Sequence, residues 1–143
     1  METYVRKEVQ AVIYDIVNSE IFVLLVKKLD PKRFLFRWRL LKGGIENKEK
    51  EEEALRREIK EEVGLKNIKI EKKIGSYEYK ALNTLHKVST FLVRGDIKEK
   101  MKIDTKEVVG AAWLKLKEAK RLISFKEERK ALEILEEEKF NAS

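Results

Sequence analysis

Three glutamates in the middle of the chain have the spacing that could bind a hard cation. Glu58, Glu61 and Glu62 would share an arc of about 100° on a helix, next to an apolar arc that carries Leu55 and Ile59. Like charges at this spacing cost about 0.2–0.5 kcal/mol per pair, so a bound cation would stabilise them. Mg²⁺ prefers such carboxylate oxygens and completes its coordination with waters and phosphates. A solvated acidic helix face is the alternative interpretation.

The charge distribution supports a metal site beside a polyanion. Residues 46–62 contain eight acids and five bases, a net charge of −3, which leaves +10 for the remainder of a chain whose total is +7. There is no cysteine and only one histidine, so thiol chemistry is excluded and a nucleophilic triad has almost no material. The sequence contains no signal peptide and no run of about 18 apolar residues. We therefore expect a cytoplasmic protein without a membrane partner.

The elements that must position the acids can be estimated from hydrophobic period and turn residues. Short β-branched segments predict strands at 9–17, 21–26, 36–40, 67–80, 87–94 and 107–114, with a break at 42–44. A helix is predicted over 47–63, with Asn47 as its N-cap and Gly64 as the glycine that ends it. Two further helices are expected at 116–123 and 126–140. Strands around one mid-chain helix, followed by helices, predict a mixed sheet sandwiched between helices.

A fixed pattern of residues runs from the predicted break into the predicted helix. Gly43 is followed after five residues by Glu49, and after seven more by the run REIKEEVGL at 57–65. This pattern resembles the Nudix box, Gly-x5-Glu-x7-Arg-Glu-U-x-Glu-Glu-x-Gly-U, where U is a bulky aliphatic residue. Every restricted position matches, in a sequence with only six glycines. The resemblance implies an α/β Nudix-type α/β/α sandwich with a mixed sheet, as a single domain over 1–143 with its box at 43–65.

The resemblance also implies roles for the matched residues. Glu61 and Glu62 would be metal ligands, and Glu58 a further ligand or a base that contacts the attacking water. Gly43 would let the backbone approach the metal, which is expected to be Mg²⁺, with Mn²⁺ as an alternative. Direct attack of water on phosphorus is the mechanism that follows, because a bound cation lowers the pKa of water and neutralises the leaving group.

Two further groups of residues complete the expected catalytic machinery. Arg57 would orient the glutamates, with Glu49 as its partner and Gly64 as a structural position of the motif. A fourth carboxylate is expected from Glu107, because Glu107 and the following Trp-Leu resemble the Glu-x5-Trp-Leu of one branch of the family. Asp104 is the second candidate for this role.

Sequence outside the box resembles the asymmetrical dinucleoside-tetraphosphate hydrolase branch. Residues 38–46 resemble its Trp-x-x-Pro-Lys-Gly-x-U-Glu, except that leucine replaces the proline, which leaves the loop less pre-set in shape. Lys42 and Lys87 are candidate phosphate contacts. Tyr79 and Phe125 are candidate adenine-stacking platforms, with Tyr77 as another aromatic candidate.

The expected function is therefore a Mg²⁺-dependent pyrophosphohydrolase of nucleoside-diphosphate-linked compounds, with diadenosine tetraphosphate cut to ATP and AMP. Two alternatives share the box: hydrolysis of diphosphoinositol polyphosphates and hydrolysis at the 5′ end of RNA, the one nucleic-acid partner considered. From another class, the chain could be a non-catalytic nucleotide or RNA sensor. The partner is otherwise a small nucleotide polyphosphate, and the oligomeric state is left open.

Overall fold

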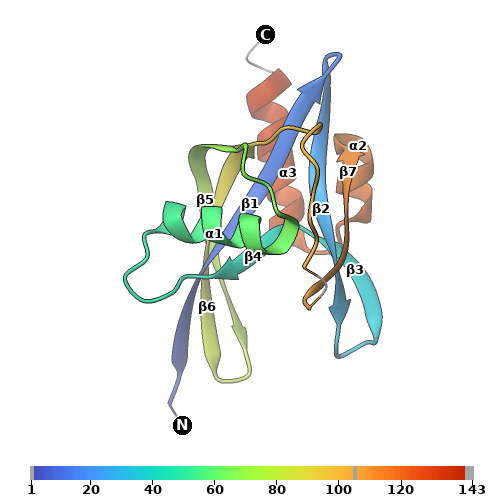
Figure 1. Ribbon diagram of the computed structural model, residues 1–143. Helices are drawn as coiled ribbons and strands as arrows, with labels where there is room; N and C mark the ends of the chain where they lie inside the picture. The colour runs from blue at the N-terminus through green and yellow to red at the C-terminus, as the bar shows by residue number, and fades with distance from the viewer. Residues whose placement is uncertain (1, 105, 141–143) are drawn as a thin grey trace.

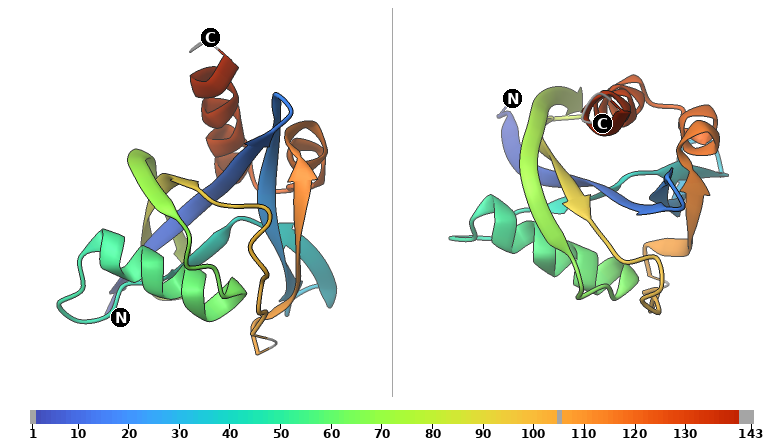
Figure 2. Two further views of the ribbon diagram at one scale, coloured as in Figure 1. Left: turned by 45° about the horizontal axis from the view of Figure 1, so that its top comes forward. Right: turned by 90° about the horizontal axis from the view of Figure 1, so that it is seen from above.

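The protein folds as a seven-stranded mixed sheet with helices on both faces, as a computed structural model describes for residues 2–104 and 106–140 (Figure 1). The strands are β1 (Tyr4–Val17), β2 (Glu20–Asp30), β3 (Leu35–Arg39), β4 (Leu41–Gly44), β5 (Lys69–Ala81), β6 (Thr84–Arg94) and β7 (Val108–Lys115). The helices are α1 (Glu51–Val63), α2 (Leu116–Leu122) and α3 (Lys126–Phe140). Figure 2 shows α1 on one face and α3 on the other. The predicted α/β/α sandwich with a mixed sheet is confirmed.

The centre of the sheet is β1, whose two edges have different partners. One edge pairs with β6 in parallel, from Tyr4 to Tyr14. The other edge pairs with β4 through Glu8–Ala11 and with β2 through Tyr14–Val17, both antiparallel. Farther along, β2 no longer pairs with β1 and pairs with β3 instead. β3 therefore lies beside β2, whereas β4, which follows it directly in the chain, lies beside β1. The segment 42–44 therefore lies where β1 and β2 diverge.

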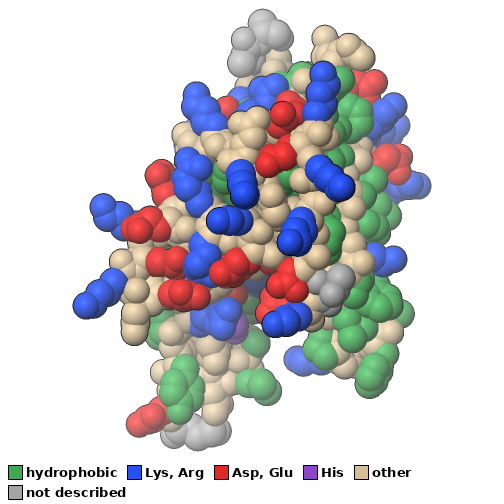
Figure 3. Space-filling model, viewed as in Figure 1, with side chains coloured by type: hydrophobic (Ala, Val, Ile, Leu, Met, Phe, Trp, Pro, Cys, Tyr) green, Lys and Arg blue, Asp and Glu red, His purple; other side chains and the backbone are tan. Residues whose placement is uncertain are grey.

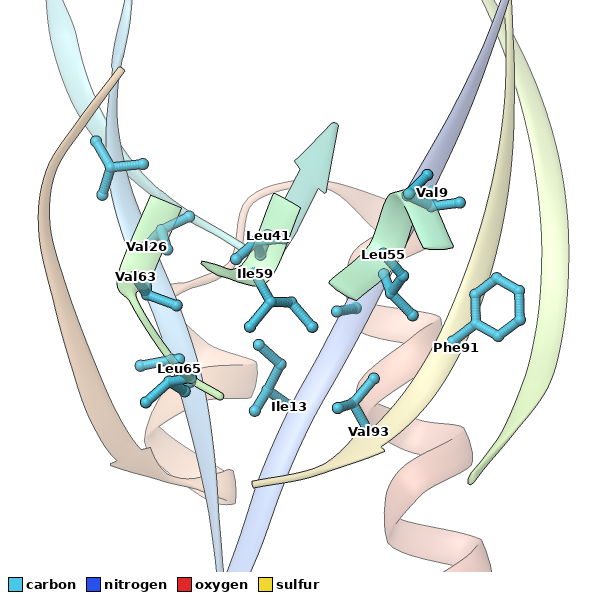
Figure 4. Packing of buried hydrophobic residues seen from close by; sticks show 14 residues of the cluster. Val9, Ile13, Val26, Leu41, Leu55, Ile59, Val63, Leu65, Phe91 and Val93 are labelled. Atoms are coloured by element: carbon cyan, nitrogen blue, oxygen red, sulfur yellow. The ribbon is translucent and has the colours of Figure 1, made fainter. Parts of the chain in front are cut away.

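Two apolar cores lie on the two faces of the sheet. Ile13 of β1 belongs to the same buried cluster as Leu55 and Ile59 of α1 (Figure 4). Val12 directly precedes Ile13 and so faces the opposite side of β1, where it is clustered with Leu132 of α3. Each such buried side chain contributes about 1.5–3 kcal/mol. The core on the α1 side therefore fixes which edge of α1 is left to face solvent.

The predicted N-cap of the central helix is wrong by three residues. The helix begins at Glu51 with Lys50 at the N-cap, rather than with Asn47 at that position. Lys48 adopts a φ of 66°, a left-handed conformation that a helix cannot contain. The Lys50 amide donates instead to the Glu53 carboxylate at 3.1 Å. Glu49 consequently lies in the loop before α1 rather than on the helix.

Other predicted boundaries also change. Residues 42–44 were expected as a break but belong to strand β4, because their backbone pairs with β1. β1 begins at Tyr4 rather than at residue 9, and β5 and β6 form one long hairpin joined at residues 82 and 83. The two predicted C-terminal helices are present as α2 and α3. None of the helices within 2–104 and 106–140 is both long and apolar enough to cross a membrane.

Gly64 ends α1 in a conformation that a larger residue would resist. Its φ is 73°, and its amide donates to the Lys60 carbonyl at 3.0 Å. A Cβ at Gly64 would lie 2.8 Å from the Cβ and 2.9 Å from the backbone nitrogen of Lys102. The segment that contains Lys102 is bound to this end of α1, because the Lys102 amide donates to the Val63 carbonyl at 2.9 Å.

We predict that Gly64→Ala lowers the free energy of unfolding by at least about 1–2 kcal/mol, the cost of the left-handed conformation for an L-residue. Urea denaturation followed by circular dichroism measures the change. Gly75→Ala is the matched control, because a Cβ there meets nothing within 4 Å and should leave stability unchanged or slightly raised. Equal effects of the two substitutions would contradict this account of the helix end.

Candidate active site

The backbone of β4 leaves room for one of the helical carboxylates. A Cβ at Gly43 would lie 2.0 Å from Cδ and 2.2 Å from Oε2 of Glu58, so the Glu58 side chain occupies the space that any other residue would fill. Burial is the main cause that raises the pKa of Glu58, with Arg57 acting in the opposite direction. The glycine therefore allows a partly buried carboxylate to pack against the backbone of residue 43.

Arg57 organises the carboxylates around it. Its Nε and Nη2 donate to the two oxygens of Glu49 at 2.7 and 2.9 Å, and Nη2 also donates to the Gly44 carbonyl at 2.8 Å. Nη1 donates to Glu58 at 2.8 Å and to Glu61 at 3.2 Å. The Arg57 guanidinium holds the pKa of Glu49 down at about 2. This geometry, which only a planar fork with five donors can make, fits the orienting role expected for Arg57.

Glu62 is the most buried of the three glutamates, and it is incompletely paired. Its side chain is 6% exposed, Oε1 lies 3.2 Å from Nζ of Lys28, and Oε2 has no hydrogen-bond partner among the described residues. Burial raises the pKa of Glu62 to about 7, the charges of Glu58 and Glu107 act in the same direction, and Lys28 opposes them. A buried carboxylate in this state is strongly stabilised by a further cation.

These residues line a pocket of ≈ 330 Å³ with an acidic and a basic wall. The acids are Glu8, Glu58, Glu61, Glu62, Asp104 and Glu107. The bases are Arg6, Lys28, Lys42 and Lys106. Figure 3 shows acidic side chains gathered over α1, with basic side chains around them. Both candidates for the fourth carboxylate, Asp104 and Glu107, line this pocket. The Asp104 amide donates to the Glu62 carbonyl at 3.1 Å, which ties Asp104 to the end of α1.

The donors of this pocket fit a divalent cation. Within the described ranges no three carboxylates converge closely enough to coordinate a metal as they stand. Arg57 draws Glu58 and Glu61 toward itself, and Lys28 contacts Glu62. The unpaired Oε2 of Glu62 and the Glu58 carboxylate packed against Gly43 nevertheless offer oxygen ligands suited to a hard cation. Glu58, Glu61 and Glu62 are the residues that would hold it.

A second pocket of ≈ 410 Å³ adjoins the first, and Lys42 lines both. Its walls include two of the predicted stacking residues, Tyr79 and Phe125, together with Tyr77. Arg39 covers the ring of Phe125, with its guanidinium carbon 3.9 Å from the ring centroid. The structure therefore places Lys42, Tyr79 and Phe125 around one cavity, next to the carboxylates.

The wall of the second pocket depends on two residues that sequence reasoning missed. Arg39 donates twice to one oxygen of Glu128, at 2.8 and 2.6 Å, and the other oxygen accepts from the Leu40 amide at 2.9 Å. Glu128 is 1% exposed. It lies three and four residues before the buried Ala131 and Leu132, so a charged residue on an apolar helical stripe was the signal that could have found it.

Tyr79 is more enclosed than Phe125. The ring of His86 stacks on it, with centroids 4.4 Å apart and planes at 4°, and Nζ of Lys42 lies 4.6 Å from its centroid and 2.6 Å from its hydroxyl. Glu8 contacts the ring of His86, with Oε1 of Glu8 2.6 Å from Nδ1 of His86. Burial raises the pKa of Tyr79 to about 12.

Lys87 is not brought to the carboxylate pocket. It pairs with Glu78 at 3.8 Å and lines a separate groove with Lys7 and Ser89. Adjacent residues of a strand face opposite sides of the sheet, so His86 takes the side that faces Tyr79 and Lys87 takes the other. Lys87, predicted as a phosphate contact, is therefore directed away from the carboxylate pocket.

Comparison with known protein families gives the class of this protein. The NUDIX domain model matches residues 6–135, and the chain therefore belongs to the NUDIX domain family. It is a hydrolase that acts on pyrophosphate bonds. Enzymes of this family generally need divalent cations, usually Mg²⁺. No curated protein sequence matches the chain.

Solved structures with the same fold are distant in sequence. An Ap4A hydrolase of C. elegans, described as a binary complex, is 23% identical with a TM-score of 0.78, over 96% of each chain. A dihydroneopterin triphosphate pyrophosphohydrolase of E. coli is 22% identical with a TM-score of 0.69, over 92% of this chain and 96% of that one. The NUDIX domain of Shewanella oneidensis NrtR complexed with ADP ribose is 18% identical with a TM-score of 0.71, over 96% and 89%. These similarities establish the fold.

Removing the Glu62 charge should stabilise the metal-free protein in a pH-dependent way. The folded-state pKa of about 7 lies above the ordinary value of 4.5, so the folded state binds the Glu62 proton more tightly than the unfolded state. The free energy of unfolding of the wild type therefore falls as pH rises from about 4.5 to about 7. Glu62→Gln lacks this contribution, and its advantage should grow over that range and then level off. Urea unfolding in EDTA measures it, and a pH-independent difference would contradict the account.

Replacing the guanidinium of Arg57 should damage the site without unfolding the protein. Arg57→Lys retains the charge but cannot contact Glu49, Glu58 and the Gly44 carbonyl together. We therefore expect kcat/KM for pyrophosphate-bond hydrolysis to fall roughly 10- to 100-fold and Mg²⁺ to bind more weakly. Steady-state kinetics over a Mg²⁺ titration measures this loss. Arg56→Lys, at the exposed neighbouring position, is the control and should behave like the wild type.

Proposed function

We propose that this protein is a Mg²⁺-dependent pyrophosphohydrolase of nucleoside-diphosphate-linked compounds, and that it cuts diadenosine tetraphosphate to ATP and AMP. The observation that carries the proposal is the junction of two pockets at Lys42, one lined by carboxylates and one by aromatic rings. A base held in the aromatic pocket would direct its phosphates past Lys42 toward the carboxylates. The fold shared with a C. elegans Ap4A hydrolase supports the same substrate class.

The acidic wall supplies the hydrolytic half of the site. The bound cation would lower the pKa of the attacking water and neutralise charge on the phosphates. Glu58, Glu61 and Glu62 would hold it, and Arg57, which donates to Glu58 and Glu61, would fix the positions from which these two carboxylates reach the cation. Glu58 is also suited to accept the proton of the attacking water, because burial raises its pKa toward the range of a useful base. Water attack on one phosphorus of an anhydride then breaks its bond to the bridging oxygen, and the phosphate chain on the other side of that oxygen is the leaving group.

Lys42 is the phosphate contact that the geometry supports best. Burial lowers the pKa of its ammonium, the charges of Arg39 and Lys28 act in the same direction, and those of Glu8 and Glu128 oppose them. An anion placed between the two pockets would offer this desolvated ammonium charge-assisted hydrogen bonds. Arg6, which lines the same pocket, adds a guanidinium that sequence reasoning did not single out.

Phe125 is the aromatic residue best placed to stack a base. Phe125 is 39% exposed, with the guanidinium carbon of Arg39 at 3.9 Å and that of Arg37 at 5.9 Å from its ring centroid, and the exposed part of the ring can receive a base. Tyr79 is already stacked on His86 and contacted by Lys42, and serves better as a wall that positions this lysine. Positioning of one base then decides which anhydride meets the attacking water, since the chemistry at each phosphorus is alike.

The product distribution tests the proposal. With diadenosine tetraphosphate and Mg²⁺, chromatography should give one ATP and one AMP per substrate. Two ADP would refute the asymmetric cut. No cleavage, together with rapid turnover of diphosphoinositol polyphosphates or of RNA with a 5′-triphosphate, would assign the enzyme to those substrates, which do not present an adenosine at both ends. Nucleotide binding without turnover of any of them would indicate a sensor.

Phe125→Ala should raise KM for diadenosine tetraphosphate roughly 10-fold, which corresponds to the ~1–3 kcal/mol of base stacking, with a smaller effect on kcat. Steady-state kinetics on purified variants gives the two parameters separately. Phe140→Ala is the matched control, because Phe125 directly precedes α3 whereas Phe140 is the last residue of that helix. An unchanged KM for Phe125→Ala would remove Phe125 as the platform.

A further inference from the structure

Lys28 reaches the carboxylate pocket because it follows Leu24 and Val26 on the face of β2 that packs against α1. The pairing of β2 with β7 shifts register between Lys27 and Lys28: Lys27 pairs with Gly110, whereas Lys28 pairs with Val108. The extra residue of this bulge is Val109 of β7, so the alternation of side chains along β2 is kept. Lys27 lies over the rings of Phe36 and Trp38 at 5.6 and 5.7 Å, whereas Lys28 points to α1. Two consecutive lysines thus have unrelated environments.

The partner of Lys28 in the protein without metal is one of the residues that would hold the metal. Its Nζ lies 3.2 Å from Oε1 of Glu62, whose side chain is 6% exposed, while the Lys28 side chain is 23% exposed. Mg²⁺ demands close, direct contact with its carboxylate ligands and carries twice the charge of an ammonium group. The two cations therefore compete for Glu62, and a metal bound there would repel Lys28.

A displaced Lys28 side chain has space beside the substrate path. It borders the carboxylate pocket and also a smaller hollow of ≈ 190 Å³. The acid of that hollow, Asp30, is already paired with Arg37 at 3.1 Å. Lys28 is also close enough to Lys42 for its charge to act on that ammonium. Once released from Glu62, Lys28 would stand with Lys42 over the region where phosphates must lie.

We propose that Lys28 is a metal-responsive phosphate contact: it neutralises Glu62 in the metal-free protein and turns to the phosphate chain of the substrate when a divalent cation occupies Glu62. This inference rests on the proposed function. It assigns to one side chain two successive partners, a carboxylate and a phosphate, so the free lysine is available only when the metal is present. Binding of metal and of polyphosphate are thereby coupled, because each step provides the counter-charge that the next step needs.

The experiment measures the reactivity of individual lysines in the full chain. Trace acetylation with an amine-reactive ester, read by tandem mass spectrometry, is performed without metal, with saturating Mg²⁺, and with Mg²⁺ plus methylenediphosphonate. We expect Lys28 to become several-fold more reactive with Mg²⁺ alone and protected again by the diphosphonate. Lys27 is the internal control and should not change. Calorimetric titration of Mg²⁺ on the same samples establishes saturation.

Two variants make the outcome decisive. Glu62→Gln should give the reactive Lys28 without metal, and Mg²⁺ should add nothing further. Lys28→Met should raise KM for the polyphosphate substrate roughly tenfold with little change in kcat, while Lys27→Met should leave both unchanged. If Mg²⁺ binds and Lys28 stays unreactive, Lys28 is a structural partner of Glu62 and this inference is overturned while the proposed function stands. If no Mg²⁺ binds, both are overturned together.

Discussion

The organisation of this protein depends on the repulsion among carboxylates concentrated on one edge of α1. Glu58 and Glu62 are largely buried at this edge, and burial raises the pKa of both. The chain offsets the repulsion with two cations of different kinds. Arg57 is held by Glu49 and the Gly44 carbonyl as well as by Glu58, so it is fixed in place. Lys28 makes a single contact to Glu62 and is easier to displace.

The sheet supplies the position at which this charge can be used. β4 and β2 share one edge of β1, and the chain that links β3 to β4 crosses the point where they separate. The 42–44 backbone is thereby held in a strand, although its glycines favour a loop by composition. One consequence is that Gly43 can receive the Glu58 carboxylate and Lys42 can stand between two pockets.

The C-terminal helix takes part in the site as well as in the core. Glu128 is buried on the stripe that packs α3 against the sheet, and it holds both Arg39 and the amide of Leu40. This contact ties α3 to the segment that enters β4. The same Arg39 covers Phe125, which begins the turn into α3. The Arg39–Glu128 ion pair therefore affects both the packing of α3 and the shape of the aromatic pocket. Because Glu128 is buried, removal of either partner would be destabilising.

The sequence by itself determined the family, the sandwich architecture and the carboxylates on α1, because the box spacing and the 3.6-residue period are local properties. It did not determine the helix start, where Lys48 takes a left-handed conformation, or the facing of Lys87. Strand register decided the latter, since a shift of one residue reverses the side. Tertiary structure alone joined Arg39 to Glu128, 89 positions apart, and brought Lys28 of β2 to Glu62 of α1. Such contacts depend on the relative placement of distant elements, which no local pattern encodes.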